Sequence, residues 1–227
     1  MQSYEDWAQA RADPRFTDWL RGLVEPVWEQ AVSHRFTREL ADGTLDDEVF
    51  RRYMVEDYSF LDVFCTIIGF AIGHAPTLQD RIPLAQFLGL VTSEENTYFE
   101  RTLDALGVPE RDRTEPDLLP PTRGFHAVMR EAAHSGRYEE IIAVLVVTEW
   151  LYLDWASRVS DRTPEKFYHA EWITIHSGEG FAGFVDWLRG QIDRDGPKLD
   201  ASGRARVVEL FRRTVDLEKA FFDAAYG

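Results

Sequence analysis

The stretch that most constrains this chain is residues 141–155, Ile-Ile-Ala-Val-Leu-Val-Val-Thr-Glu-Trp-Leu-Tyr-Leu-Asp-Trp. A helix with this sequence is apolar on nearly every side, so it has no polar face for water and is expected at the centre of a larger helical assembly. Glu149 stands in the middle of it. Because stripping water from an unpaired carboxylate costs several kcal/mol, an acid there is expected to be neutral, hydrogen-bonded or kept for a function.

Two other acids, Asp57 and Glu218, also lie among apolar residues at helical spacing. The stripe around Asp57 comprises Phe50, Tyr53, Met54, Phe60, Leu61, Phe64 and Ile68, and the stripe around Glu218 comprises Phe211, Val215, Phe221, Phe222 and Ala225. Three core-facing helices that each carry one carboxylate predict a shared polar pocket. The three acids are far apart in sequence, so only a folded bundle brings them together.

Length and composition limit the class of protein. A chain of 227 residues that is 44% hydrophobic suits one compact domain, expected over residues 1–227. The net charge of −15, with no cluster of Lys or Arg, argues against a nucleic-acid or anionic-membrane surface, because both polyanions would be repelled. We therefore expect a small-molecule partner.

The compartment is predicted from the cysteine content and the N-terminal residues. The single cysteine excludes an intramolecular disulfide, and residues 1–7 lack the basic and apolar regions of a signal peptide. No apolar run reaches the roughly 20 residues that span a bilayer. A cytoplasmic protein is expected.

Helical periodicity dominates the chain, which predicts an all-α fold. Thr44 is expected to cap a helix that runs from about 46 to 75, and a second helix is expected to run through Phe87 to Leu106. Residues 108–123 are predicted to be irregular, with a helix resuming at 124–134. Thr163 and Pro164 are expected to start a short helix, and the turn at 195–197 precedes the C-terminal helix with Glu218.

Several motifs together resemble the TenA family, also called thiaminase II. They are His34-Arg-Phe36, Leu40-Ala-Asp-Gly-Thr-Leu45, Asp57-Tyr-Ser-Phe60, Thr148-Glu149-Trp-Leu-Tyr152, Trp172-Ile-Thr-Ile-His-Ser-Gly-Glu-Gly-Phe181 and Leu217-Glu218-Lys-Ala-Phe221. The resemblance covers nearly the whole chain. It implies the haem-oxygenase-like helical bundle, assembled as a homo-oligomer, usually a tetramer, that works without metal or organic cofactor.

The resemblance also implies an activity. Family members bind a 4-aminopyrimidine derived from thiamin and hydrolyse its aminomethyl group to hydroxymethyl. One branch has a nucleophilic cysteine at the position of Thr148, so this chain resembles the other branch, which carries a glutamate at the position of Glu149. That branch implies an aminopyrimidine aminohydrolase of thiamin salvage acting on 4-amino-5-aminomethyl-2-methylpyrimidine or its formyl derivative. Intact thiamin stays open as a substrate.

The resemblance assigns the walls of the family's pocket to Phe60, Phe125, Tyr152 and Phe221, and it places His176 where the family has a tyrosine. A neutral aminopyrimidine is flat and has a donor/acceptor edge, which suits aromatic faces with carboxylates at the rim.

We expect Asp57 to bind the exocyclic amino group and a ring nitrogen. Glu149 would act at the leaving amine or the attacked carbon, as nucleophile or as general acid or base, with Glu218 in the complementary protonation state. Tyr152 is expected to donate to Glu149.

The residues also suggest three other interpretations. Glu131 and His134 form a Glu-x-x-His pair, and Glu165 and His169 an i, i+4 pair, so a carboxylate-bridged di-iron oxidase is the second candidate. A non-catalytic pyrimidine-binding module is the third. Haem is disfavoured by the three acids. Cys65 has no basic neighbour, so it is interpreted as a small hydrophobic residue rather than a nucleophile.

Overall fold

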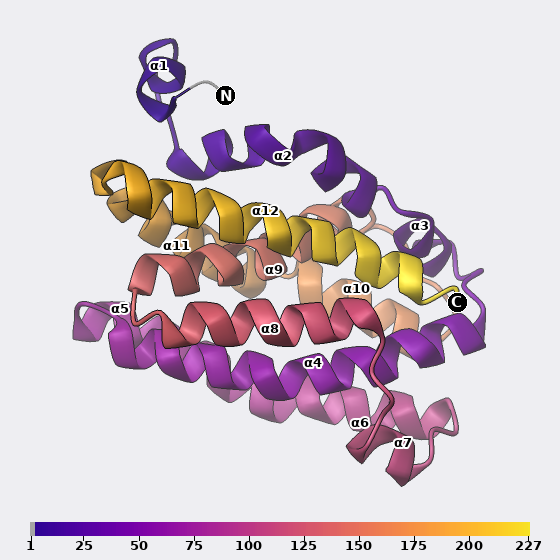
Figure 1. The fold of residues 1–227 in the computed structure, drawn as a ribbon. Helices are drawn as coiled ribbons and strands as arrows, with labels where there is room; N and C mark the ends of the chain where they lie inside the picture. The colour runs from indigo at the N-terminus through magenta and orange to yellow at the C-terminus, as the bar shows by residue number, and fades with distance from the viewer. Residues whose placement is uncertain (1–2) are drawn as a thin grey trace.

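The computed structural model describes residues 3–227, and every regular element within them is a helix (Figure 1). The predicted all-α class is therefore confirmed. Helix α9 (Tyr138–Arg158) lies at the centre of the bundle. It packs against α2 (Phe16–Val32), α4 (Asp47–His74), α8 (Pro120–His134), α10 (Phe167–Ser177), α11 (Glu179–Asp195) and α12 (Ala201–Ala224).

The central position of α9 follows from its sequence. Every residue from Ile141 to Tyr152 is buried, Glu149 included. A helix without a polar face can bury its surface only when neighbours cover it on all sides, as the surrounding helices do here.

Helix α4 begins and ends close to the predicted positions of about 46 and 75. Its N-cap is Asp46, whose side chain accepts the Glu48 N–H at 2.8 Å, so the assignment of the cap to Thr44 was wrong. Thr44 lies two residues before this cap, too early to reach the free N–H groups of the first turn, and its hydroxyl instead donates to the Glu39 carbonyl.

The helix predicted to end at Leu106 is interrupted by a wider turn. It consists of α5 (Leu78–Leu90), the π-helical segment η1 (Val91–Glu95) and α6 (Asn96–Ala105). Side-chain hydroxyls around the wide turn donate to carbonyls four residues back: Thr92 to Leu88 at 2.8 Å, Ser93 to Gly89 at 2.6 Å and Thr97 to Ser93 at 2.7 Å. These bonds supply partners for carbonyls that a regular α-helical ladder would otherwise engage.

The segment 108–123 is less irregular than predicted. It contains α7 (Glu110–Thr114), and α8 begins at Pro120 rather than at 124. Proline suits the first helical position, and the buried carboxylate of Glu56 on α4 accepts the N–H of Leu119 at 3.0 Å and the hydroxyl of Thr122. A cap from another helix therefore fixes the start of α8.

The expected helix start at Thr163 and Pro164 was also wrong, because α10 begins at Phe167. Its start is tied to α4 instead. Asp47 accepts from Lys166 and from the Tyr168 hydroxyl, each at 2.7 Å.

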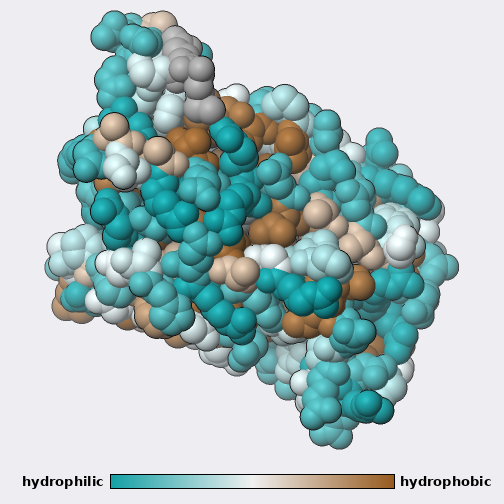
Figure 2. Space-filling view, viewed as in Figure 1, coloured by the Kyte–Doolittle hydropathy of each residue, from teal (hydrophilic) through white to brown (hydrophobic). Residues whose placement is uncertain are grey.

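The remaining elements are α1 (Tyr4–Gln9), α3 (Arg35–Ala41) and the short 3-10 helix η2 (Gly196–Lys198). Helix α1 projects from the bundle in Figure 1 and contacts α2. The face shown in Figure 2 is mostly hydrophilic, with apolar side chains visible in recesses between helices. Among residues 3–227, no helix has the length and apolar character needed to cross a membrane.

Candidate active site

A pocket of about 460 Å³ lies among α4, η1, α6, α8, α9, α10 and α12. The structure brings all eight predicted site residues to this one pocket. Its lining comprises Asp57, Phe60, Leu61, Phe64, Glu95, Phe99, Phe125, Thr148, Glu149, Tyr152, Trp172, His176, Glu218 and Phe221.

Four carboxylates line the pocket, one from each of four elements. Asp57 comes from α4, Glu95 from η1, Glu149 from α9 and Glu218 from α12. Within the described part of the chain, the pocket lining contains no lysine or arginine. The acids therefore meet one another and aromatic side chains rather than a cation.

Burial raises the pKa of each of these acids. It raises the pKa of Asp57 to about 7, with the Tyr53 hydroxyl acting in the opposite direction. The pKa values of Glu149 and Glu218 lie well above the ordinary range, first because of burial and then because neighbouring pocket acids repel a further negative charge. Four acids in one dry site cannot all ionise near neutrality, so some stay protonated and serve as donors.

Other buried acids of the protein have partners of a different kind. Asp80 meets Arg194 at 2.9 Å, Glu140 meets Arg206 at 3.2 Å, and Glu56 accepts a backbone N–H. These three stabilise contacts between helices. The acids of the pocket lack cationic partners, and such unpaired buried acids are typical of functional sites.

Aromatic rings form the walls. Phe125 packs edge-on against both Phe60 and Phe221, with ring centroids 5.1 and 5.8 Å apart. Trp172 and Phe99 complete the wall between α10 and α6. These rings make a flat-sided slot.

Tyr152 lines the pocket, but its predicted bond to Glu149 is wrong. Its hydroxyl pairs with the Tyr53 hydroxyl at 2.6 Å instead. Tyr53 lies one helical turn before Asp57 on α4, so the tyrosine pair joins α9 to the helix of another pocket acid. The spacing along α9 pointed to Glu149 on the same helix, whereas the actual partner of Tyr152 is Tyr53 on α4.

His176 is held in one tautomer. Its Nδ1 lies 2.9 Å from the Trp172 carbonyl oxygen, which can only accept, so Nδ1 carries the hydrogen and Nε2 is an acceptor. Burial lowers the pKa of His176 to about 4, so the ring is neutral.

Two side chains that could act as nucleophiles, the Thr148 hydroxyl and the Cys65 thiol, have other roles. The Thr148 hydroxyl donates to the Leu145 carbonyl at 3.1 Å, a bond within α9. Cys65 is half-buried outside the pocket lining, and burial raises the pKa of its thiol, as expected for a side chain that serves as a small hydrophobe.

Glu95 is the pocket acid that sequence reasoning missed. It lies in the polar run Thr92-Ser-Glu-Glu-Asn-Thr97, which has the composition of a solvated helix face. Only the π-helical turn, a feature that recurs at functional sites, marks this position as unusual. The spacing of apolar residues in the sequence does not predict such a turn.

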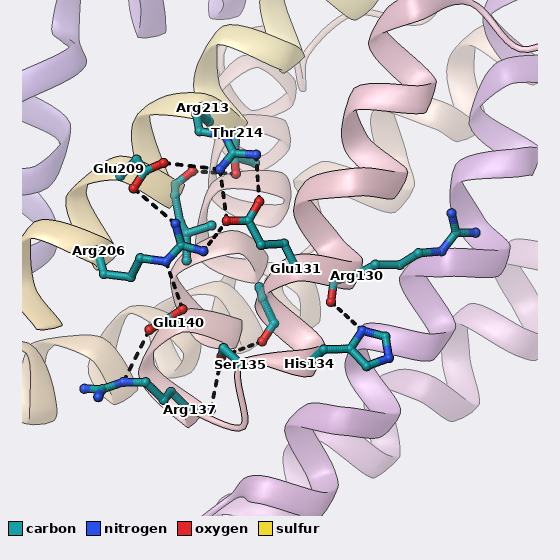
Figure 3. A network of polar contacts seen from close by, with 12 residues as sticks. Arg130, Glu131, His134, Ser135, Arg137, Glu140, Arg206, Glu209, Arg213 and Thr214 are labelled. Carbon is teal, nitrogen blue, oxygen red and sulfur yellow. Dashed lines mark hydrogen bonds and ion pairs between the residues drawn. The ribbon is translucent and has the colours of Figure 1, made fainter.

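The geometry does not support the di-iron alternative. Glu131 is engaged by Arg206 and by Arg213, the latter at 2.9 Å, and the His134 ring bonds the Arg130 carbonyl (Figure 3). Glu165 is exposed ahead of α10, whereas the His169 ring is buried against Phe50 and Tyr168. Within residues 3–227, no three or more His, Cys, Asp or Glu side chains are arranged so that they could hold a metal ion.

Fold and site together define an all-helical protein with an aromatic pocket lined by unpaired carboxylates. The model of the TENA/THI-4/PQQC family matches residues 23–227. The chain belongs to this family, as its motifs predicted.

Curated relatives are similar over most of their length. An aminopyrimidine aminohydrolase of Halalkalibacterium halodurans is 23% identical over 215 residues, covering 93% of this chain and 96% of the relative. A protein of the same name from Bacillus subtilis is 23% identical, with 93% of this chain and 90% of the relative covered. Among solved structures, a TenA homologue from Pyrococcus furiosus has a TM-score of 0.82 at 22% identity, covering 93% of this chain and all of that one, which shows the shared fold.

Proposed function

We propose that this protein is an aminopyrimidine aminohydrolase. It would cleave the bond between the exocyclic methylene carbon of a 4-aminopyrimidine and its amine nitrogen, giving the hydroxymethyl-pyrimidine. The observation that carries the proposal is the convergence of four carboxylates without a cation in a slot with aromatic walls. The names of the relatives from three bacteria support it.

In this proposal the aromatic walls hold the pyrimidine ring. Phe60, Phe125 and Phe221 supply apolar faces, and Asp57 accepts hydrogen bonds from the amino edge of the ring. The Nε2 acceptor of His176 is a second polar group available to the ring edge.

Glu149 and Glu218 carry the chemistry. The raised pKa of Glu149 makes its ionised form a strong base, and this form accepts a proton from water as the water oxygen attacks the methylene carbon. Glu218 stays protonated beside it, since the second of two neighbouring buried acids resists ionisation. Thr148 at the position of the family's thiol supports the assignment of the chain to the glutamate branch, where a carboxylate replaces the thiol.

The test is turnover of 4-amino-5-aminomethyl-2-methylpyrimidine, followed by the appearance of the hydroxymethyl product in liquid chromatography. Glu149→Gln should lower kcat by about 100-fold or more, the usual scale of general acid–base catalysis. Glu139→Gln, on the same helix outside the pocket, is the matched control. Wild-type activity in Glu149→Gln would refute the mechanism, and binding without turnover by the wild type would identify a pyrimidine-binding module.

We also infer that the protein is a homo-oligomer. The outer face of α5 exposes Leu78, Ile82 and Leu90 at 62%, 46% and 50%. Large apolar side chains gathered on one helix face are typical of surfaces that a partner covers. A cytoplasmic location stays a prediction.

A further inference from the structure

A second chamber opens beside the acid pocket. It has about 990 Å³ of space and shares three lining residues with the pocket: Glu95, Glu149 and His176. Its other lining residues are Phe87, Leu90, Glu94, Tyr98, Arg101, Glu171, Ile175, Gly180, Phe181 and Phe184. Leu90, Glu94 and Gly180 are exposed, so the chamber reaches solvent, and its lining includes neither Asp57 nor Glu218.

The chamber has apolar walls and several acidic side chains in its lining. Phe87 stacks on Phe184 with ring centroids 3.9 Å apart, and Phe181 lies beside them. Arg101 is the only basic side chain among the described lining residues, and both of its terminal nitrogens bond the Glu171 carboxylate at 2.9 Å.

The arginine is therefore neutralised and offers no free positive charge to an anion, whereas the carboxyl oxygens of Glu94, Glu95 and Glu149 can accept hydrogen bonds from an amine. Such a chamber favours an amine with an apolar body over a carboxylate or a phosphate.

Among the residues that the structure describes, two acids border both spaces, Glu149 and Glu95. A substrate whose ring fills the aromatic slot and whose substituent extends into the chamber would place its C–N bond between them. Glu95 ends the π-helical turn, and burial, followed by the charge of Asp57, raises its pKa to about 8. It therefore retains its proton at neutral pH.

We propose that the second chamber is the subsite for the leaving amine, and that Glu95 gives the departing nitrogen its proton. This assignment rests on the proposed hydrolase function and adds to it the place of the leaving group and the residue that protonates it. Asp57 and Glu218 line only the ring pocket, so they stay with the ring and the methylene carbon.

In the proposed hydrolysis, water replaces the amine on the methylene carbon. The water oxygen bonds to the methylene carbon, and one water proton goes to Glu149. The C–N bond breaks with its electron pair passing to nitrogen, which takes the proton of Glu95. Substrate and water become alcohol and amine, and a proton passing from Glu149 to Glu95 restores the enzyme.

The first experiment fills the chamber. A Cβ built on Gly180 meets nothing within 4 Å, and its backbone is ordinary helix, so Gly180→Leu adds a side chain at the chamber wall without a clash. Gly183→Leu is the matched control, on the same helix with equally open space but outside the chamber lining.

With the aminomethyl substrate, Gly180→Leu should keep kcat/KM within about twofold. With an N-benzyl-aminomethyl substrate it should lose at least about tenfold, the scale of a steric overlap in a packed site. Gly183→Leu should resemble the wild type with both. If Gly180→Leu lost kcat/KM equally for the two substrates, the chamber would be a common entrance. If it lost kcat/KM for neither, the chamber would be an unused cavity. Either result would overturn the subsite.

The second experiment concerns the proton. An alkylamine needs a proton to leave, whereas an arylamine leaves more readily without one. Glu95→Gln should lower kcat about 100-fold for an N-alkyl substrate and within about threefold for an N-aryl substrate, with the binding of the hydroxymethyl product unchanged. Glu100→Gln, an exposed acid on the adjoining helix α6 and outside both linings, is the control. Equal losses for both leaving groups in Glu95→Gln would refute the assignment.

The experiments distinguish failure of the hydrolase function from failure of the subsite assignment. If the wild type cleaves neither the aminomethyl nor the N-substituted substrates, the hydrolase function itself is wrong. If it cleaves the aminomethyl substrate and the chamber variants show no dependence on the leaving group, only the subsite is wrong.

Discussion

At the scale of single residues, the partner of a buried acid distinguishes an acid that stabilises the fold from one that is available for chemistry. Glu140 and Asp80 are as deeply buried as Glu149, yet each meets an arginine. Glu149 and Glu218 meet aromatic rings and other acids. The burial of an acid is visible in the apolar pattern around it, whereas its partner is a matter of three-dimensional placement.

The Asp57 carboxylate is predicted to orient the ring rather than to perform chemistry. Asp57→Asn should raise KM about tenfold or more, because a hydrogen bond to a charged group contributes about 1.5–3 kcal/mol. Steady-state kinetics with the aminomethyl substrate measure the effect. Asp62→Asn, at an exposed site on the same helix, should leave KM unchanged. A fall in kcat with KM unchanged would instead give Asp57 a chemical role.

The raised pKa of Asp57 also predicts how stability depends on pH. The folded chain disfavours the ionised form, so the contribution of this group is greatest below its ordinary pKa near 4 and is lost as the pH rises to about 7. The free energy of unfolding, measured in urea, should therefore decline between pH 5 and pH 7. Asp57→Asn should reduce that decline, and an unchanged decline in this variant would contradict the raised pKa.

At the scale of elements, contacts between helices determine where several helices start. The buried Glu56 carboxylate of α4 takes the place of a local cap on α8. The positions of Pro120 and Pro121 are compatible with a helix start there, but proline alone does not choose between a loop and a first turn.

Removal of this inter-helix cap should destabilise the protein without changing catalysis. Glu56→Ala leaves the Leu119 N–H and the Thr122 hydroxyl without their partner, at a cost of about 1–3 kcal/mol. Urea denaturation measures the loss. KM for the aminomethyl substrate should stay at the wild-type value because Glu56 does not line the pocket. A variant as stable as the wild type would show that water replaces the cap.

At the scale of the whole molecule, we propose that residues 1–227 fold as one domain. The buried apolar residues form one cluster drawn from the N-terminal and C-terminal helices alike. Unfolding in urea, followed by fluorescence and by circular dichroism, should therefore give one coincident transition. Two separated transitions would show independent units.

Self-association should depend on the outer face of α5. Ile82→Asp places a charge on the face that Leu78 and Leu90 share and should shift the wild-type oligomer toward smaller species. Light scattering after size-exclusion chromatography measures the mass. Gln79→Asp, at an exposed polar position on the same helix, should keep the wild-type mass. An unchanged mass for Ile82→Asp would move the interface elsewhere.

The amino-acid sequence by itself determined the helical class, the central place of α9, and the burial of Asp57, Glu149 and Glu218. These follow from the periodicity of apolar side chains, which is a local property. The family motifs added the aromatic walls, and the structure places all of them at the same pocket.

Tertiary structure alone decided the rest. The pairing of Tyr152 with Tyr53, the capping of α8 by Glu56 and the entry of Glu95 into the pocket depend on side chains that meet from different helices. Residues distant in the sequence become neighbours only when the bundle packs, and no spacing along one helix records which neighbour it will have. The second chamber has the same origin, because its walls come from six separate elements.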